Sequence, residues 1–286
     1  MSTVRAAARS VSDLALVLRR FTYGESSLVV HVLTRAHGKA HLLAKGAYRP
    51  RSRFGGVLDL FDTLEVRWSE RAGAELGVLE DAQLLERRHR IAHSLGAYRA
   101  ALTMLELANL AAPERAACTE LFELCAAGLD SLRSGRDPTR CVVEFELGFL
   151  HNLGLAPTLE ACASCGGAAP ATDLSDRARP RAEFSASAGG RLCAPCARRA
   201  RESGARVGTL PLDVLELAAA LRRDRSSSDA LAPSAELLER AHDLTARFVQ
   251  HQIESQPKSY RVFLAGPHRN RKAPSAAPNP REGEAW

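Results

Sequence analysis

The chain has 286 residues, of which 45% are hydrophobic and 25% charged, and its net charge at neutral pH is +6. A chain of this length can form two domains, each with its own hydrophobic core. No apolar run approaches the roughly 18 residues that cross a bilayer, and the N-terminal residues lack the apolar segment of a secretory signal, so we expect a cytoplasmic protein with no membrane span.

Residues 12–86 follow a short tail, residues 1–11, that we expect to be disordered, and they show a β-rich pattern. Short apolar runs are separated by glycine-containing turns and recur about every ten residues, which is typical of a small antiparallel barrel of the OB type. The predicted strands are residues 14–20, 27–34, 39–46, 60–68 and 76–85. The second run, SLVVHVLT, is apolar on both faces, as expected in a closed barrel.

A basic segment runs from Arg35 to Arg53, through the third predicted strand and into the connection to the fourth. It contains six cations and no acidic residue. Cations neutralise phosphates, and interleaved aromatic rings stack on bases, so we favour a nucleic-acid surface over a merely solvated loop. The candidate nucleic-acid-binding residues of this segment are Arg35, Lys39, Lys45, Tyr48, Arg49, Arg51 and Arg53. Arg19 and Arg20 of the first predicted strand are further candidates.

The geometry of the basic segment can also be predicted. Lys39 and Lys45 are expected at the two ends of one strand, and residues 49–53 are expected to continue into a flexible loop. Trp68 is predicted to be a core residue. Phe21 and Tyr23 are ambiguous between core and surface, and we interpret the strand histidines, His31 and His41, as ordinary barrel residues without a role.

Residues 87–264 change to a helical pattern. The apolar periodicity and the positions of Pro113, Pro138 and Pro211 predict five helices. These helices are residues 90–111, 114–132, 139–153, 211–223 and 235–256, with a polar loop at 225–234. Residues 265–286 are rich in Pro, Arg and Ala without periodicity, which predicts a disordered basic tail.

Four cysteines interrupt the helical domain as two Cys-x-x-Cys pairs, Cys162 with Cys165 and Cys193 with Cys196. Two intervening residues let a tight turn direct both sulfurs at one ion, so two such pairs predict a structural, tetrahedral zinc site. The stretch between the pairs is polar and cannot form a core alone, so a metal would be needed to order the insertion, residues 159–201.

Three other interpretations of these cysteines compete with structural zinc. A disulfide pair is disfavoured because there is no secretory signal and because Cys118, Cys125 and Cys141 occupy helical faces as buried apolar residues do. A thiol-redox motif would need a βαβ context, which is absent. A catalytic zinc would need a general base, and the sequence contains neither His-x-Glu nor His-Glu-x-x-His.

The segment AKGAYRPRSRF in the predicted barrel, and the Cys-x-x-Cys pairs that follow GLAP in the helical domain, resemble the bacterial RecO family of DNA repair proteins. The opening LVLRRFTYGESSLVVHVLT is similar to the first two strands of that family, and the resemblance runs from about residue 14 to about residue 264. Tyr48 departs from the pattern, because the family has a second basic residue there, and it offers a stacking contact instead.

The resemblance implies an α+β multidomain protein, with an N-terminal five-stranded OB-type barrel followed by an all-α domain that carries an inserted four-cysteine zinc element. It implies a recombination mediator, not an enzyme, that binds single- and double-stranded DNA and anneals complementary strands. With RecR, such a protein helps RecA replace single-strand-binding protein, so it would be associated with the nucleoid. An OB or zinc-ribbon protein that binds RNA or has a regulatory role, and a thiol redox enzyme, are the rival interpretations.

Overall fold

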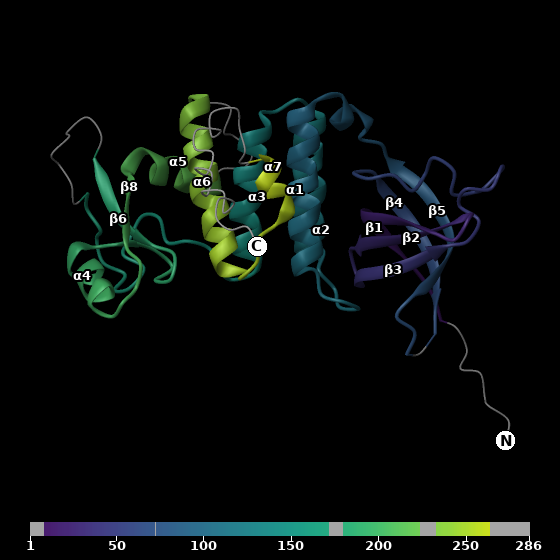
Figure 1. Ribbon diagram of the computed structural model, residues 1–286, viewed down its shortest axis with the longest axis horizontal. Coiled ribbons are helices and arrows are strands. Elements are labelled where there is room, and N and C mark those ends of the chain that lie inside the picture. The colour runs from purple at the N-terminus through teal and green to yellow at the C-terminus, as the bar shows by residue number, and fades with distance from the viewer. Residues whose placement is uncertain (1–8, 72, 172–179, 224–232, 264–286) are drawn as a thin grey trace, which may run out of the picture.

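Three parts follow one another along the molecule, and they appear from right to left in Figure 1 as a β-barrel, a group of helices and a small β-module. The computed structural model describes residues 9–71, 73–171, 180–223 and 233–263. The predicted tails, apart from residues 9–11, and most of the predicted loop at 225–234 lie outside the described residues. Within the described part, no helix combines the length and apolarity that a membrane span requires.

The barrel is closed and five-stranded, with the strand order β1-β2-β3-β5-β4. Its strands are β1 (Arg9–Tyr23), β2 (Ser27–Thr34), β3 (Gly38–Ala44), β4 (Thr63–Glu70) and β5 (Gly77–Glu86). β3 and β5 pair in parallel and all other neighbours are antiparallel. The predicted OB-type fold is therefore confirmed. β1 begins earlier than expected, at Arg9, so residues 9–11 of the predicted tail pair with β4.

The two faces of β2 are buried against different parts of the molecule. Val30 and Val32 lie in the barrel core with Trp68, which is fully buried as predicted. Leu33 points outward and joins the core of the helical domain together with Leu16 of β1. Because successive strand residues point to opposite faces, this packing explains why β2 is apolar on both sides.

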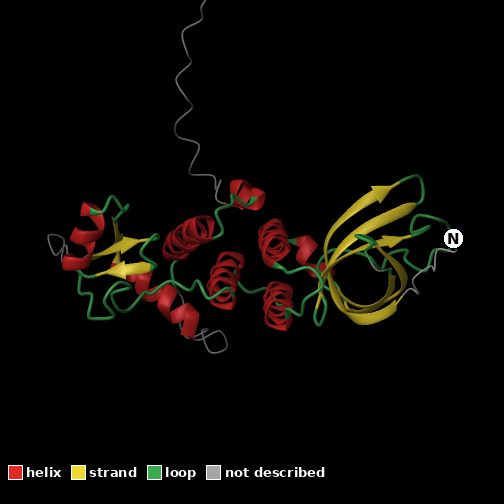
Figure 2. Ribbon diagram, turned by 90° about the horizontal axis from the view of Figure 1, so that it is seen from below, coloured by secondary structure: helices red, strands yellow, loops and turns green. Residues whose placement is uncertain are grey.

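The helical domain is built around α3 (Pro138–Asn152), in which every residue from Arg140 to Leu150 is buried. Figure 2 shows the helices between the barrel and the small β-module. The others are the short 3₁₀ helix η1 (His89–His93) and α1 (Leu95–Ala111), α2 (Thr119–Arg133), α5 (Leu212–Arg223), α6 (Ala235–Gln252) and α7 (Lys258–Phe263). Their apolar faces form one continuous core.

Two predicted helix starts need correction and one is confirmed. The first predicted helix is broken at Ser94, whose side chain caps α1 by accepting a hydrogen bond from the N–H of Ala97. Pro113 does not open α2, because its carbonyl accepts a hydrogen bond from the N–H of Lys39 at 2.8 Å, which ties this connection to the barrel. Pro138 does open α3, where Asp137 is the N-cap.

The C-terminal part of the domain also differs from expectation. α6 ends at Gln252 and not at residue 256, and the separate helix α7 follows. The carboxylate of Glu106 in α1 accepts hydrogen bonds from the N–H groups of Lys258 and Ser259, and burial of Tyr260 attaches α7 to the bundle. The start of a helix leaves such N–H groups without partners, so a carboxylate there stabilises it.

Arg88 fastens the barrel to the helices. Its side chain is almost fully buried and donates hydrogen bonds to the carbonyl of Phe61 and to the hydroxyl of Thr63 in the barrel. The same guanidinium contacts the carboxylate of Asp130 in α2 at 2.8 Å and that of Glu86 in β5 at 3.2 Å. One side chain therefore satisfies partners on both sides of the domain boundary.

The cysteine insertion forms a module with its own sheet, in the order β7-β6-β8. It contains β6 (Arg181–Ser185), β7 (Gly190–Leu192), α4 (Ala194–Glu202) and β8 (Gly208–Pro211). The module therefore extends beyond the predicted limit of residue 201. It rests on the helical core through Phe184, whose ring centroid lies 5.9 Å from that of Phe248 in α6.

Candidate metal centre and basic barrel surface

The four cysteines of the two Cys-x-x-Cys pairs converge on one point, as predicted. Their sulfur atoms all lie within 4.8 Å of one another, and the sulfurs of Cys165 and Cys193 are 3.9 Å apart. Four sulfurs at about 2.3 Å from a central zinc ion are about 3.8 Å from one another in a tetrahedron, whereas a disulfide needs about 2.05 Å. The arrangement therefore fits a metal ion, and all four cysteines are free.

The first pair lies on a tight turn. The N–H of Cys162 donates to the carbonyl of Gly167, and the carbonyl of Cys162 accepts from the N–H of Gly166, both at 2.8 Å. Gly166 has a φ of +72°, a conformation that glycine adopts without a steric penalty. This closed turn directs the sulfurs of Cys162 and Cys165 to the same side.

The second pair lies where β7 gives way to α4, with Cys193 directly before the helix and Cys196 in its first turn. Gly190 in β7 has a φ of +146°, and a Cβ atom there would approach the carbonyl oxygen of Thr158 to 2.2 Å. Only glycine fits this contact. The N–H of Ala163 then donates to the carbonyl of Arg191 at 2.7 Å, so backbone hydrogen bonds hold the two halves of the site together.

The surroundings of the sulfurs favour ionised thiols at some positions and oppose them at others. Burial opposes ionisation of Cys162, but N–H groups of Cys193, Cys165 and Ser164 lower the pKa of its thiol to about 6. The guanidinium of Arg199, 3.0 Å from the sulfur of Cys196, lowers the pKa of that thiol.

Cys193 holds its proton. A backbone N–H of Cys196 favours its thiolate, but hydrogen bonds with the sulfurs of Cys196, Cys162 and Cys165 outweigh that effect and raise its pKa to about 11. Four adjacent thiolates repel one another, so a divalent cation supplies the charge that allows all four to ionise. Four protein ligands fill a tetrahedron and leave no position for water or substrate, which is the pattern of a structural site.

The remaining three cysteines are buried in the helical domain, as predicted. Burial raises the pKa of the Cys118 thiol to about 11 and that of Cys141 to about 12, and it also raises the pKa of Cys125. Such thiols behave as small apolar side chains.

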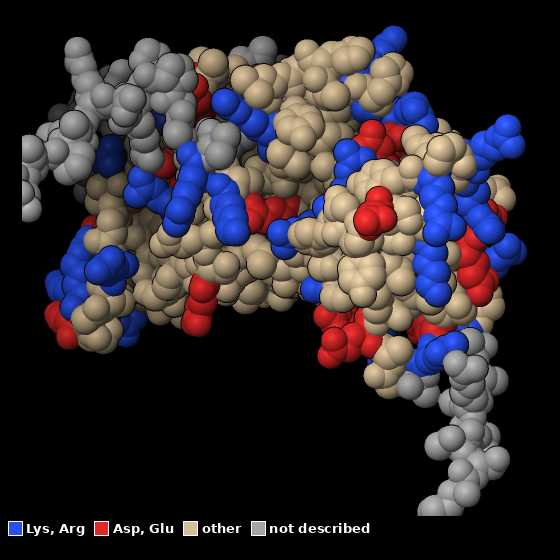
Figure 3. Space-filling view, turned by 45° about the vertical axis from the view of Figure 1, so that its right-hand side comes forward, with Lys and Arg blue, Asp and Glu red and all other residues tan. Residues whose placement is uncertain are grey.

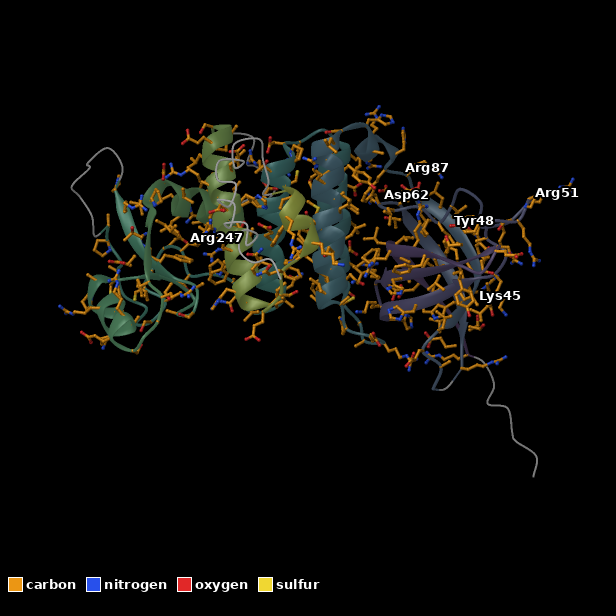
Figure 4. The ribbon with its side chains drawn as sticks, in the orientation of Figure 1. Lys45, Tyr48, Arg51, Asp62, Arg87 and Arg247 are labelled. Carbon is orange, nitrogen blue, oxygen red and sulfur yellow. The ribbon has the colours of Figure 1, made fainter. Side chains whose placement is uncertain are left out.

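The connection between β3 and β4, residues 45–62, is here called the basic loop; it begins at the end of the barrel that points away from the helices and returns to the side that faces them. Lys45, Tyr48 and Arg51 lie there in Figure 4, whereas Asp62 and Arg87 lie on the side facing the helices. The space-filling view shows basic side chains gathered on the barrel, at right in Figure 3.

The basic loop was predicted to be flexible, but it is a series of hydrogen-bonded turns. Phe54 and Leu58 are buried in the barrel core and anchor it. The N–H of Tyr48 donates to the carbonyl of Ser26 at 2.9 Å, which joins the loop to the β1–β2 turn. The cations on its outer side are therefore presented from a hydrogen-bonded backbone that is anchored in the barrel core.

The cations of the basic loop differ in whether their side chains are bound to other groups of the protein. Lys45, Arg49 and Arg51 are exposed. Arg53 is exposed too, but it donates to the carbonyl of Glu80 at 2.8 Å and lies over the ring of Phe54.

Arg35 and Lys39 do not lie with the other candidates. Arg35 forms an ion pair with Glu123 of α2 at 2.8 Å, and the ammonium of Lys39 donates to the carbonyl of Asn109 in α1 at 3.2 Å. Lys39 and Lys45 are at opposite ends of β3, as expected, but the end with Lys39 faces the helices. The structure therefore places these two cations at the domain boundary.

Arg19 and Arg20 also separate, because adjacent strand residues point to opposite faces. The guanidinium of Arg20 pairs with Asp59 at 3.0 Å and donates to the carbonyl of Leu58. The guanidinium of Arg19 lies 5.0 Å from the ring centroid of Phe21, on the outer face of the sheet.

The structure also brings together rings to which the sequence assigned no role. Phe21, His31 and His41 lie side by side on the outer face of β1, β2 and β3. Their positions in the sequence are ten residues apart, so only the strand register reveals that they are neighbours. Phe21 also lies beyond the predicted first strand, residues 14–20, so the predicted elements did not place it beside the two histidines.

Comparison with known proteins agrees with this architecture. The family model described as recombination protein O, N-terminal, matches residues 9–88, and its C-terminal counterpart matches residues 92–261. The chain is 36% identical to the DNA repair protein RecO of Anaeromyxobacter sp. (strain K), over 83% of this chain and 89% of that protein. It is 33% identical to the DNA repair protein RecO of Myxococcus xanthus, over 86% of this chain and 94% of that protein.

Proposed function

Because the chain belongs to the recombination protein O family of DNA repair proteins, we propose that it is a recombination mediator that binds single- and double-stranded DNA and anneals complementary strands. The observation that supports this most is the basic loop at the free end of an OB-type barrel. Its exposed cations lie beside Tyr48, which is 56% exposed. Cations that bind phosphates next to exposed rings are what a protein needs to hold single strands without regard to sequence.

The cysteine cluster is proposed to hold one zinc ion through Cys162, Cys165, Cys193 and Cys196. The four-thiolate ligand set and the spacing of the sulfurs support zinc in a structural role. The ion would contribute folding free energy to the β-module and thereby to its attachment on α6. It takes no part in a chemical step.

Annealing would be a stoichiometric binding process and not an enzymatic turnover. Two complementary strands repel each other, and cations on the protein reduce that repulsion while the bases remain free to pair. The partners we propose follow from the family: RecR, single-strand-binding protein and, indirectly, RecA, on DNA in the nucleoid.

A charge-matched comparison tests the role of the basic loop. One variant carries Arg49→Ala, Arg51→Ala and Arg53→Ala. The control carries Arg67→Ala, Arg206→Ala and Arg247→Ala, which remove the same charge from β4, the β-module and α6. Affinity for a single-stranded oligonucleotide is measured across a series of salt concentrations, and annealing of complementary strands is measured without nucleotide.

We expect the loop variant to flatten the log–log salt dependence by up to about 0.7 per lost phosphate contact and to slow annealing, while the control changes little. Equal effects of both variants would mean that only net charge matters, and the proposal would fail. A marked preference for RNA over DNA of the same sequence would favour the rival RNA-binding interpretation.

A further inference from the structure

A row of rings, exposed at Phe21 and Tyr23 and half-buried at His31 and His41, crosses the outer face of the barrel beside the basic loop. This ring row consists of His41 on β3, His31 on β2, and Phe21 and Tyr23 on β1. The strand register aligns it: Arg19 is opposite His31, and His31 is opposite His41. An irregularity in the pairing between Val17 and Arg19 shifts the register of β1, as a β-bulge does, and bulges re-aim side chains in this way.

Three of the four rings, those of Phe21, His31 and His41, contact one another in a defined geometry. His31 and His41 are stacked, with ring centroids 3.9 Å apart and an angle of 26° between their planes. Phe21 meets His31 edge to face, with centroids 5.2 Å apart. The guanidinium of Arg19 lies 5.0 Å from the centroid of the Phe21 ring, so the row includes a cation–π contact.

The ring row is not part of either core. Phe21 is 40% exposed and Tyr23 58% exposed, whereas Leu16 and Leu33 on the same outer face are buried by the helices. The helices thus cover one part of this sheet face and leave the ring row open. Single exposed apolar residues are common on soluble proteins, but a contiguous group of them often marks a binding site.

The ring row is continuous with the basic loop. Tyr23 pairs with Ser27 across the β1–β2 hairpin, and the hydroxyl of Ser27 accepts a hydrogen bond from the N–H of Gly46. The carbonyl of Ser26, the residue before Ser27 in the hairpin turn, accepts a hydrogen bond from the N–H of Tyr48. Rings and loop cations therefore follow one another along one surface.

His31 keeps a neutral ring at physiological pH. Burial, followed by the charges of His41, Arg19 and Lys39, lowers its pKa to about 4, against the smaller opposing effect of Glu114. A neutral imidazole is a flat aromatic surface and not a further cation. The surface thus combines the neutral ring of His31 with the permanent cation of Arg19 beside it and with the cations of the basic loop.

We propose that the ring row is a stacking surface for the unpaired bases of a single strand whose phosphates contact the basic loop. This inference rests on the proposed function and specifies it further. A planar ring accepts the face of any base, whereas the bases of a duplex are already stacked and cannot reach it. The row therefore distinguishes single strands from duplexes, and it leaves the pairing edges of the bases available to a second strand.

The test compares Phe21→Leu with wild type on three ligands: an oligothymidylate, a strand of the same length in which abasic sites replace the central bases, and a duplex. Leucine keeps an apolar side chain in β1 but removes the ring. The matched control is Leu110→Ala, which trims an apolar residue of α1 that is 47% exposed and does not belong to the ring row. Binding is measured at a salt concentration high enough to weaken phosphate contacts.

We expect Phe21→Leu to weaken oligothymidylate binding about five- to 150-fold, the range for loss of one stacked base. Binding of the abasic strand and of the duplex, and the salt slope, should stay at wild-type values, and Leu110→Ala should change nothing. Equal weakening on normal and abasic strands, or no weakening at all, would overturn the stacking surface while leaving the DNA-binding function intact. If wild type itself binds none of the three ligands at any salt concentration, the proposed function fails first.

Discussion

At the scale of single residues, the surroundings of each cysteine decide its chemistry. Of the seven cysteines, four form the cluster and three are buried in the helical domain. The pKa of Cys118 is raised to about 11 and that of Cys141 to about 12. At pH 7.5 fewer than about one in a thousand of these thiols is ionised, and only the thiolate reacts rapidly.

We therefore predict that a thiol-modifying reagent added after metal chelation at pH 7.5 modifies the four cluster cysteines first, with Cys193 the slowest of them because its pKa is raised to about 11. The other three react only when a denaturant unfolds the helical domain. Modified thiols are counted by mass spectrometry with and without chelator, and fully unfolded protein serves as the reference for all seven. Rapid modification of Cys125 in the chelated but otherwise folded protein would contradict the prediction.

Residue identity alone did not reveal which cations are available to a ligand. The cysteine cluster was predictable because two-residue spacing fixes local geometry, and distant parts of the chain change it little. Arg35 and Lys39 belong to the same run of cations as Arg51, yet they bind Glu123 and the carbonyl of Asn109 on helices that begin dozens of residues later. No pattern within the run contains that information.

At the scale of elements, the joint between barrel and helices depends on Arg88. Its side chain is only 1% exposed and contacts Asp130 of α2, whereas Arg133, which contacts the same carboxylate, is 38% exposed. Removal of a buried charge partner costs several times more than removal of an exposed one, because the remaining polar groups stay buried without partners. The two arginines form a matched pair.

We predict that Arg88→Met lowers the free energy of unfolding by about 3–5 kcal/mol, while Arg133→Met lowers it by less than about 1 kcal/mol. Urea unfolding, followed by circular dichroism, measures both. Equal losses in the two variants would show that burial of Arg88 does not make the joint.

Element prediction succeeded where periodicity was strong and failed where tertiary contacts decided. All five strands were predicted because alternation and turn residues agree along the barrel. The start of α2 was not, because the residues after Pro113 are used to meet β3, where Gly38 lies against the carbonyl of Ala116. The sheet of the β-module was missed because its strands are three to five residues long and carry little pattern.

At the scale of the whole molecule, the cysteine module and the basic loop lie at opposite ends, with the helical domain between them (Figure 1). The module rests on α6 through Phe184, and the barrel is attached through Arg88 and the outward residues Leu16 and Leu33. The two ends share no contact among the described residues, so their stabilities and activities should separate.

Because the two ends are separate, a change at one end should leave the properties of the other unaltered. Cys193→Ser removes one of four ligands, so metal content and the melting temperature of the helical domain should fall, while affinity for single-stranded DNA stays within about twofold, since mutations at distant sites rarely interact. The variant with Arg49→Ala, Arg51→Ala and Arg53→Ala should do the reverse. Cys118→Ser, which changes a thiol outside the cluster, is the control and should keep the metal.

The state of the barrel must be known for this comparison. Trp68 is fully buried in the barrel core, so its fluorescence in a Trp286→Phe background reports whether the barrel remains folded. Loss of DNA binding in Cys193→Ser with an unchanged Trp68 signal would show that the module itself contacts DNA. Such a result would move part of the binding site to the far end of the molecule, because a folded barrel that carries the basic loop would then not suffice.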